Sequence, residues 1–288
     1  MKLPRYSSFV LTIPLATALL TPAVGQAAKN IVYRAKPTPP RAGVASLENA
    51  TLRENLSWMF GGKPQRGWQL YEPLIAQFIR AEGDVAGGEF AVALARWQQA
   101  VKLPATRILD LETWLKMVEL WQARRSKDHT IPPAEKLVTI SAAEFYDPER
   151  PAELRQVERE TYAAYKRMVT AAVKELGLAT GGNGYLAASE QFLKIISAFR
   201  SPEYQQKLRA QSPNTGRAGL AVNSPHFTGR TLDLYVGGEP VSTKDANRAV
   251  QVNTKVYRWL VKNAGRFGFI PYFYEPWHWE YNPQGAKQ

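Results

Sequence analysis

Two short segments near the C-terminus hold the residues best suited to chemistry. Two of the three histidines lie there, His226 and His278, and each has a carboxylate close by, Asp233 after the first and Glu275 before the second. Two imidazoles and one carboxylate can bind a zinc ion and leave its fourth position open, as in catalytic zinc sites. Glu275 is then suitably placed to take a proton from water at that position. The chain has no cysteine, which excludes a zinc site built on thiolates.

A second carboxylate, Glu280, lies close to the same histidine and competes with Glu275 for the role of proton acceptor. Pro276 favours an extended backbone at Glu275. Asp233 also has an ordinary interpretation, as a carboxylate near the end of a strand. The third histidine, His129, lies in a polar stretch beside prolines, and we expect it at the surface. From these residues alone, both glutamates remain candidates for proton transfer.

Three stretches of sequence predict the strands that carry these groups. Residues 192–199 are mostly apolar, 231–236 alternate so that Asp233 points away from the more apolar face, and 269–281 are rich in aromatic residues. Residues two apart share a face of a strand, which puts His278 beside Glu280. Short strands of this kind favour a small antiparallel sheet.

Helices are predicted on both sides of these strands in the sequence. Residues 151–176 have apolar side chains at helical spacing and are followed by Gly177, which suits the end of a helix. Residues 244–264 repeat the pattern, with Ser242 or Thr243 as the cap. We therefore predict an α+β fold in which helices flank the small antiparallel sheet that carries the zinc site.

A small all-α domain is expected to precede this one. Residues 50–124 contain three helical stretches, and Asp110 can cap the last of them. The Pro-rich residues 28–49 are predicted to be a tether. Residues 125–137 include two adjacent prolines and are predicted to be a linker, which assigns residues 138–288 to the zinc domain.

The first 27 residues are predicted to be a secretory signal peptide. Lys2 and Arg5 are followed by the apolar residues 9–20 and then by small residues up to Ala27. The apolar run is interrupted and shorter than the roughly 20 residues of a membrane span. We therefore expect export to the periplasm, the cell wall or the extracellular space, with no stable membrane span.

The chain is basic, with a formal net charge of +12, or +10 once Lys2 and Arg5 are removed with the signal. A basic exported protein is attracted to anionic surfaces such as cell-wall polymers. Nucleic acid is the usual alternative partner, but the sequence has no basic stripe with interleaved aromatic residues and no nucleic-acid motif. We expect a monomer that does not bind nucleic acid.

Three motifs in the second half of the chain identify a family. The pattern Ser-x-x-Arg-Ser-x-x-x-Gln occurs at 197–205, Ser-x-His-x-x-Gly-x-x-x-Asp at 224–233, and Glu-x-Trp-His at 275–278. With these motifs, residues 150 to 283 resemble the VanY-type D-alanyl-D-alanine carboxypeptidases. Those enzymes are zinc peptidases related to lysostaphin-like enzymes and to the hedgehog N-terminal domain. Three motifs in the right order are far more specific than one short match.

The resemblance implies a role for each motif residue. His226, Asp233 and His278 would bind one Zn²⁺, and Glu275 would be the catalytic base. Arg200 would bind or polarise the substrate near the scissile bond. The remaining substrate contacts are expected from Ser201, Gln205, Ser224 and Trp277. Phe199 replaces the tyrosine that the family usually has before the arginine, so one hydroxyl group is lost.

The predicted function is a zinc-dependent D,D-carboxypeptidase that hydrolyses the terminal D-Ala-D-Ala bond of peptidoglycan stem peptides. We prefer a terminal bond because Arg200 can pair with a free carboxylate. Two other enzymes remain open, an L,D-carboxypeptidase and a peptidoglycan endopeptidase. A non-catalytic wall-binding protein on the same fold is the alternative from another class.

The small helical domain has a weaker resemblance of its own. Trp97-Gln98-Gln99, Leu103-Pro104, Leu109-Asp110 and Thr113-Trp114 resemble the second half of a peptidoglycan-binding helical domain. The glycine that usually follows the Leu-Pro pair is replaced near Arg107. An ordinary three-helix bundle with tryptophans in its core is the alternative interpretation.

Overall fold

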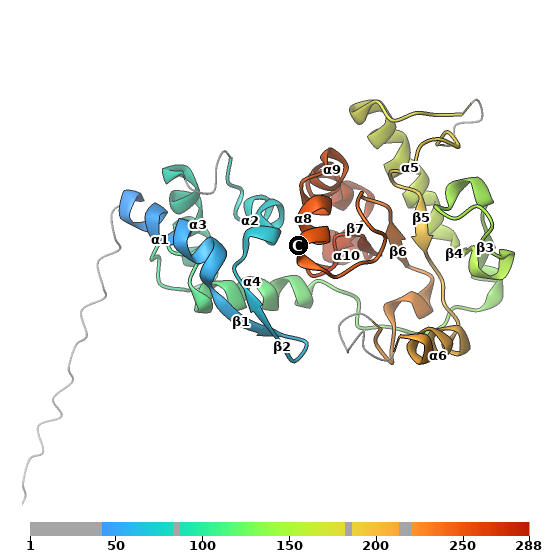
Figure 1. The fold of residues 1–288 in the computed structure, drawn as a ribbon, viewed down its shortest axis with the longest axis horizontal. Helices are drawn as coiled ribbons and strands as arrows, with labels where there is room; N and C mark the ends of the chain where they lie inside the picture. Colours follow the sequence, from blue (N-terminus) through green and yellow to red (C-terminus); the bar gives the residue numbers. More distant parts are fainter. Residues whose placement is uncertain (1–41, 83–86, 182–185, 213–219, 288) are drawn as a thin grey trace, which may run out of the picture. The chain divides into compact units, whose positions relative to one another are not determined.

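The computed structural model describes residues 42–82, 87–181, 186–212 and 220–287 (Figure 1). All of the described residues belong to one compact unit. The predicted signal peptide and residues 28–41 of the predicted tether lie outside the described residues. No helix in the described part of the chain is long and apolar enough to cross a membrane.

The N-terminal helices are α1 (Ala42–Asn55), α2 (Glu72–Ile79), α3 (Gly88–Ala100) and α4 (Leu111–Ala123). Helix α4 begins as predicted, since the Asp110 carboxylate accepts a hydrogen bond from the Thr113 N–H at 2.9 Å. Helix α1 starts inside the segment predicted to be a tether. The structure also adds an antiparallel hairpin of β1 (Ser57–Phe60) and β2 (Lys63–Arg66) to these helices.

The predicted helix 151–176 is shorter than expected. Its first residues form a 3-10 turn, η4 (Ala152–Leu154), and strand β4 (Gln156–Glu158), which pairs with β3 (Leu137–Thr139). Helix α5 (Arg159–Leu176) begins only after Glu158, whose carboxylate accepts a hydrogen bond from the Thr161 N–H at 2.9 Å. Gly177 ends it in the left-handed conformation, with φ of 66°.

The sheet that carries the site has four antiparallel strands in the order β5-β6-β8-β7. They are β5 (Ile195–Ser197), β6 (Thr231–Leu234), β8 (His278–Tyr281) and β7 (Phe269–Pro271). The stretch 269–281 is therefore two strands and a turn, not one strand. The predicted antiparallel sheet with flanking helices is confirmed.

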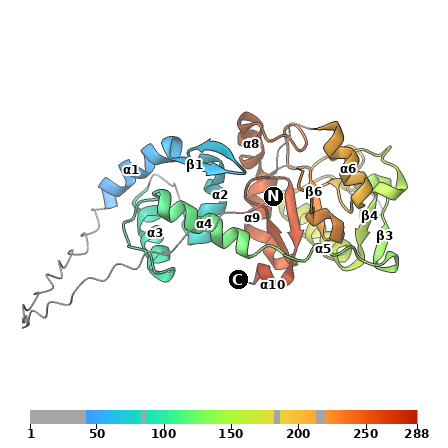
Figure 2. The same cartoon turned by 90° about the horizontal axis from the view of Figure 1, so that it is seen from below.

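The predicted helix 244–264 is divided into α8 (Asp245–Val252) and α9 (Lys255–Asn263). Lys244 precedes α8 without a side-chain cap, while the Thr254 hydroxyl caps α9 by accepting a hydrogen bond from the Tyr257 N–H at 3.1 Å. Helix α9 packs against α2 and α5 and lies between them in both views (Figures 1 and 2).

The remaining helices lie between and after the strands. They are α6 (Pro202–Gln211), α10 (Pro283–Ala286) and the 3-10 turns η1 (Gln69–Tyr71), η2 (Ala134–Lys136), η3 (Ala142–Glu144), η5 (Pro225–Thr228) and η6 (Ala264–Phe267).

Two apolar clusters stabilise the unit. The larger lies around the sheet and includes Tyr165 and Met168 of α5, Leu260 of α9 and Trp279 of β8. The second includes Trp68, Trp114 and Met117, together with Tyr272, Phe273 and Tyr274 from the turn between β7 and β8. The N-terminal helices and the sheet thus share one of their cores.

The turn before β6 requires a glycine at position 229. Gly229 has φ of 66°, and a Cβ there would lie 3.0 Å from both the Glu158 nitrogen and the Leu137 side chain. The left-handed backbone conformation and the close neighbouring atoms both disfavour any residue with a side chain at this position. We expect Gly229→Ala to lower the free energy of unfolding by about 1–3 kcal/mol in denaturant titrations.

Gly265→Ala is the matched control. Its φ is not positive, and an added Cβ would meet nothing nearer than the Ala286 carbonyl oxygen at 3.9 Å. Equal stability changes at both glycines would contradict the constraint on the turn.

Candidate metal centre

The central strands of the sheet bring two of the three predicted ligands together. Asp233 of β6 and His278 of β8 are direct cross-strand partners. His226 lies on η5, just before β6, and the Ser224 hydroxyl caps this turn by accepting a hydrogen bond from the His226 N–H at 3.3 Å. Two strands and one short turn thus position the cluster.

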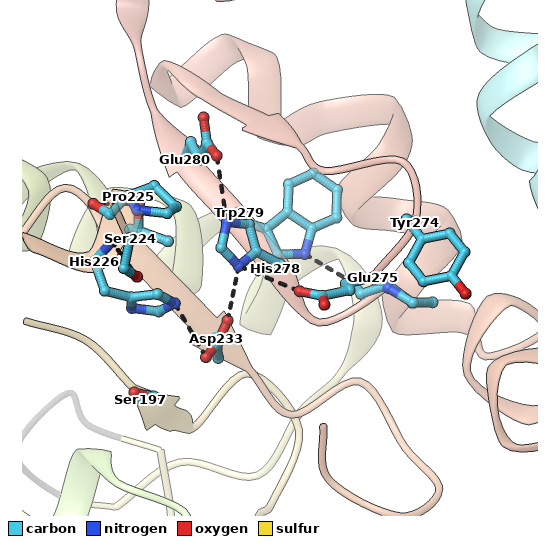
Figure 3. Close-up of polar contacts among 12 residues, drawn as sticks. Ser197, Ser224, Pro225, His226, Asp233, Tyr274, Glu275, His278, Trp279 and Glu280 are labelled. Carbon is cyan, nitrogen blue, oxygen red and sulfur yellow. Dashed lines mark hydrogen bonds and ion pairs between the residues drawn. The ribbon is translucent and has the colours of Figure 1, made fainter. Parts of the chain in front are cut away.

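The three side chains point toward one another (Figure 3). His226 Nε2 lies 3.3 Å from Asp233 Oδ2, and His278 Nδ1 lies 3.1 Å from Asp233 Oδ1. The candidate ligand atoms all lie within 4.8 Å of one another, and the residues are only 2–4% exposed. Neighbouring ligand atoms around a tetrahedral zinc ion are about 3.3 Å apart, given bonds of about 2.0 Å. The cluster fits one zinc ion.

The ring of His226 is held in the orientation that a ligand needs. Its Nδ1 lies 2.7 Å from the Ala198 carbonyl oxygen, an acceptor, so Nδ1 carries the proton and Nε2 is left with a lone pair. Burial and the nearby charge of Arg200 lower the pKa of His226 to about 4. The ring is therefore neutral near pH 7, as metal binding requires.

In His278 it is Nδ1, not Nε2 as in His226, that faces Asp233 and would bind a metal. Its Nε2 lies 3.3 Å from Glu280 Oε1, while Nδ1 faces Asp233. Although burial works to lower it, hydrogen bonds with Asp233 and Glu280 raise the pKa of His278 to about 9. This ring is therefore protonated near pH 7 without a metal, and metal binding must displace its proton. A carboxylate behind a metal-binding histidine fixes the ring and makes it a stronger ligand.

Arg125 holds Glu280 in turn. Its Nε donates to Glu280 Oε1 at 2.8 Å, its Nη2 contacts the same oxygen, and its guanidinium lies 4.1 Å from the centre of the Tyr272 ring. Burial favours the neutral acid, but the hydrogen bond with His278 and the charge of Arg125 lower the pKa of Glu280 to about 2. Glu280 is thus an ionised support for His278 and contacts its Nε2, the nitrogen that does not face Asp233.

Glu275 lies beside the cluster. Its Oε2 is 3.7 Å from Nδ1 of His278, the same nitrogen that faces Asp233. Burial raises the pKa of Glu275 to about 7. The turn that carries it is held by the Trp279 indole, which donates to the Pro276 carbonyl oxygen at 3.1 Å. A carboxylate with this pKa can accept and release a proton near neutral pH.

Arg200 is held through all three of its nitrogens, one of which contacts the cluster. Nη2 donates to Asp233 Oδ2 at 2.7 Å, Nε to Ser197 Oγ at 2.9 Å and Nη1 to Gln205 Oε1 at 3.4 Å. Although burial works to raise it, contacts with His226, His278 and Arg200 hold the pKa of Asp233 well below its usual range. Asp233 is therefore an anion ready to bind a cation.

The other predicted site residues divide into two groups. Ser224 and Trp277 line the pocket at the cluster, which has a volume of about 440 Å³. Ser201 caps α6 by accepting from the Tyr204 N–H at 3.2 Å, and Gln205 donates to the Ala221 carbonyl oxygen at 2.9 Å. These two residues support the wall instead of lining the pocket.

Some pocket residues were not foreseen. Arg125, Arg150, Tyr204 and Tyr272 also line the pocket. The contact of His278 with Glu280 was predicted from the sequence, because residues two apart share a face of a strand. Arg125 precedes Glu280 by 155 positions, and no local pattern predicts such a contact.

The match to the family model of the VanY D-alanyl-D-alanine carboxypeptidases covers residues 155–284. That span contains all three motifs and the whole metal cluster. Residues 155–284 belong to the VanY family. The family description, a D-alanyl-D-alanine carboxypeptidase, agrees with the resemblance found in the sequence, and the cluster supplies the residues that a zinc peptidase needs.

Two solved structures are similar to the chain. One is a variant of the vancomycin resistance D,D-pentapeptidase VanY from a VanB-type resistance cassette in complex with Zn(II), with 21% identity, 58% of this chain and 92% of that chain covered, and a TM-score of 0.35. The other is VanYB in complex with D-Alanine-D-Alanine, with 21% identity, coverage of 46% and 75%, and a TM-score of 0.30. No curated protein matches the chain.

The support of His278 can be tested by zinc affinity. We expect Glu280→Gln and Arg125→Gln to weaken zinc binding by about 10–100-fold, because each loosens the carboxylate that holds the ring. Competition with a chromophoric chelator measures the affinity without any assay of activity. Glu153→Gln, an exposed glutamate, is the control. Unchanged affinity in Glu280→Gln would show that the carboxylate does not support the ligand.

Proposed function

We propose that the chain is a zinc-dependent D,D-carboxypeptidase that hydrolyses the terminal D-Ala-D-Ala bond of peptidoglycan stem peptides. The observation that carries this proposal is the buried set of His226, Asp233 and His278, with Glu275 beside it, inside a VanY domain. All three metal ligands and the proton acceptor are present in this chain. A non-catalytic wall protein has no need of a buried carboxylate beside a metal ligand.

In this proposal, His226 through Nε2, His278 through Nδ1 and Asp233 through its carboxylate bind the metal. Bound zinc supplies Lewis acidity: it lowers the pKa of water toward about 7 and stabilises negative charge. All three ligands are buried, and each of them lines the pocket. The Ala198 carbonyl and Glu280 hold the two rings in place.

Glu275 is the proposed general base. Its pKa of about 7 lets it take the proton of the attacking water and pass a proton to the amine of the departing D-alanine. Arg200 contributes a fixed positive charge, because Ser197 and Asp233 hold its guanidinium against the cluster. We propose that this charge stabilises the oxyanion that forms on the substrate carbonyl.

The pocket residues have different roles toward the peptide. We propose that Ser224 and Trp277 contact the substrate, because both line the pocket. Ser201 and Gln205 act through the protein, by fixing the start of α6 and the position of Arg200. This refines the expectation that all four residues bind substrate directly.

The place of action follows from the substrate. We propose that residues 1–27 direct export, that the protein works in the periplasm or cell wall as a monomer, and that its net positive charge helps hold it to anionic wall polymers. The division into a helical region at 50–124, a linker and a peptidase domain at 138–288 also remains a proposal, as does wall binding by the helical region.

Glu275→Gln tests the assignment of the base. We expect turnover to fall by about 100-fold or more, because a neutral amide cannot accept the proton. Zinc content and the unfolding transition should stay as in the wild type. His226→Ala is the contrasting variant and should lose zinc and activity together. An active Glu275→Gln would assign proton transfer to another group.

The bond cleaved is tested with purified muropeptides, with and without chelator, read by mass spectrometry. We expect pentapeptides to lose one D-alanine, in a reaction that stops when zinc is removed. Shortening of tetrapeptides would indicate an L,D-carboxypeptidase, and cleavage of cross-linked dimers an endopeptidase. Binding of muropeptides without any cleavage would support the non-catalytic alternative.

A further inference from the structure

Three guanidinium groups line the pocket, and they differ in what they contact. Arg125 is paired with Glu280, and Arg200 with Asp233. Arg150 is different. Among the residues that the structure describes, no carboxylate oxygen lies within 4.0 Å of its nitrogens. The pocket thus pairs two of its arginines directly, while Arg150 has only the longer-range charges of Asp147 and Asp233.

Arg150 is held in place in spite of having no acidic partner. Its Nε donates to the Leu154 carbonyl oxygen at 3.2 Å, and its guanidinium lies 5.8 Å from the centre of the Phe145 ring. Phe145 is fully buried and bridges to Ile195 of β5. β5 also carries Ser197, the partner of Arg200, so the groups beside both arginines, Phe145 and Ser197, are joined to the same strand.

These contacts leave one side of the guanidinium available. In the described part of the chain, the Nη1 and Nη2 of Arg150 donate to no protein acceptor, and neither is sealed in the interior. A planar pair of N–H donors matches the two oxygens of a carboxylate. A side chain held by Nε with its terminal fork free is therefore suited to bind a carboxylate.

The surroundings make a bound anion favourable. Arg150 is half-buried. Tyr204, Asp147 and Asp233 act to raise its pKa, but desolvation, the largest effect, and the charge of Arg200 lower it overall. Both effects oppose an uncompensated positive charge. A negatively charged ligand would relieve them, and such an ion pair is stronger at a partly desolvated site than in water.

We propose that Arg150 binds the C-terminal carboxylate of the substrate peptide, an inference that rests on the proposed function. Arg200 then remains paired with Asp233 beside the reacting centre and does not recognise the chain end. Arg150 precedes the span 155–284 that matches the family model, so no motif assigns it. In this proposal, Arg150 makes the enzyme cleave a terminal peptide bond in preference to an internal one.

The test uses two peptides that differ only at the end, one finishing in D-Ala-D-Ala as the free acid and one as its C-terminal amide. Wild-type enzyme should prefer the acid by about 30-fold or more in kcat/KM, the effect expected of a desolvated charge pair. In Arg150→Gln the acid should lose about that factor, chiefly through KM, and the amide should change little. Arg150→Lys keeps the charge but not the paired N–H donors, so its kcat/KM for the acid should lie between those of wild type and Arg150→Gln.

Two controls keep this result interpretable. Arg167→Gln, an exposed arginine on α5, should behave as wild type. Equilibrium binding of both peptides to zinc-loaded Glu275→Gln, with and without Arg150→Gln, reads recognition without turnover. The acid should bind more tightly than the amide only when Arg150 is present.

The outcomes separate this proposal from the proposed function. If Arg150→Gln keeps the preference for the acid, or weakens acid and amide equally, the assignment of Arg150 is overturned while carboxypeptidase activity stands. If wild type cleaves neither peptide, the proposed function fails, and the binding measurement still decides whether Arg150 recognises the carboxylate.

Discussion

The cross-strand contact between Asp233 and His278 is the constraint on which the site depends. The two residues are opposite each other in the antiparallel pair β6–β8, so the sheet itself brings a carboxylate and an imidazole within 3.1 Å. A shift of one residue in this register would turn one partner to the other face. Trp279 lies between His278 and Glu280 in the sequence and is buried in the core. It opposes such a shift, because slippage would expose its side chain.

The metal cluster was predictable because its histidines are rare and lie in short motifs. Two of only three histidines fall in short motifs, and His278 and Glu280 share a strand face. The cap at Asp110 and the end of α5 at Gly177 were also predictable, because each depends on one local interaction or backbone conformation. A small antiparallel sheet followed from three stretches of sequence, and it has four strands because 269–281 proved to be a hairpin.

Contacts between distant segments could not be predicted in this way. Helix α5 starts at Arg159 because residues before it pair with β3, an interaction that helical periodicity does not reveal. The break between α8 and α9 depends on Thr254, whose hydroxyl also donates to the Val236 carbonyl oxygen across the fold. The different contacts of Arg125, Arg150 and Arg200 likewise depend on tertiary packing, because their sequence neighbourhoods do not show which of them meets a carboxylate.

The contact of Arg125 with Glu280 has a consequence for how the protein can be divided. Arg125 is the first residue of the predicted linker, yet it contacts the carboxylate that orients a metal ligand, and its neighbour Arg124 donates to the Gly285 carbonyl oxygen near the C-terminus. An isolated peptidase domain started at residue 138 would retain every motif of the family and lose both arginines. The contacts that hold Glu280 and the C-terminal turn therefore extend upstream of the residues by which the family is recognised.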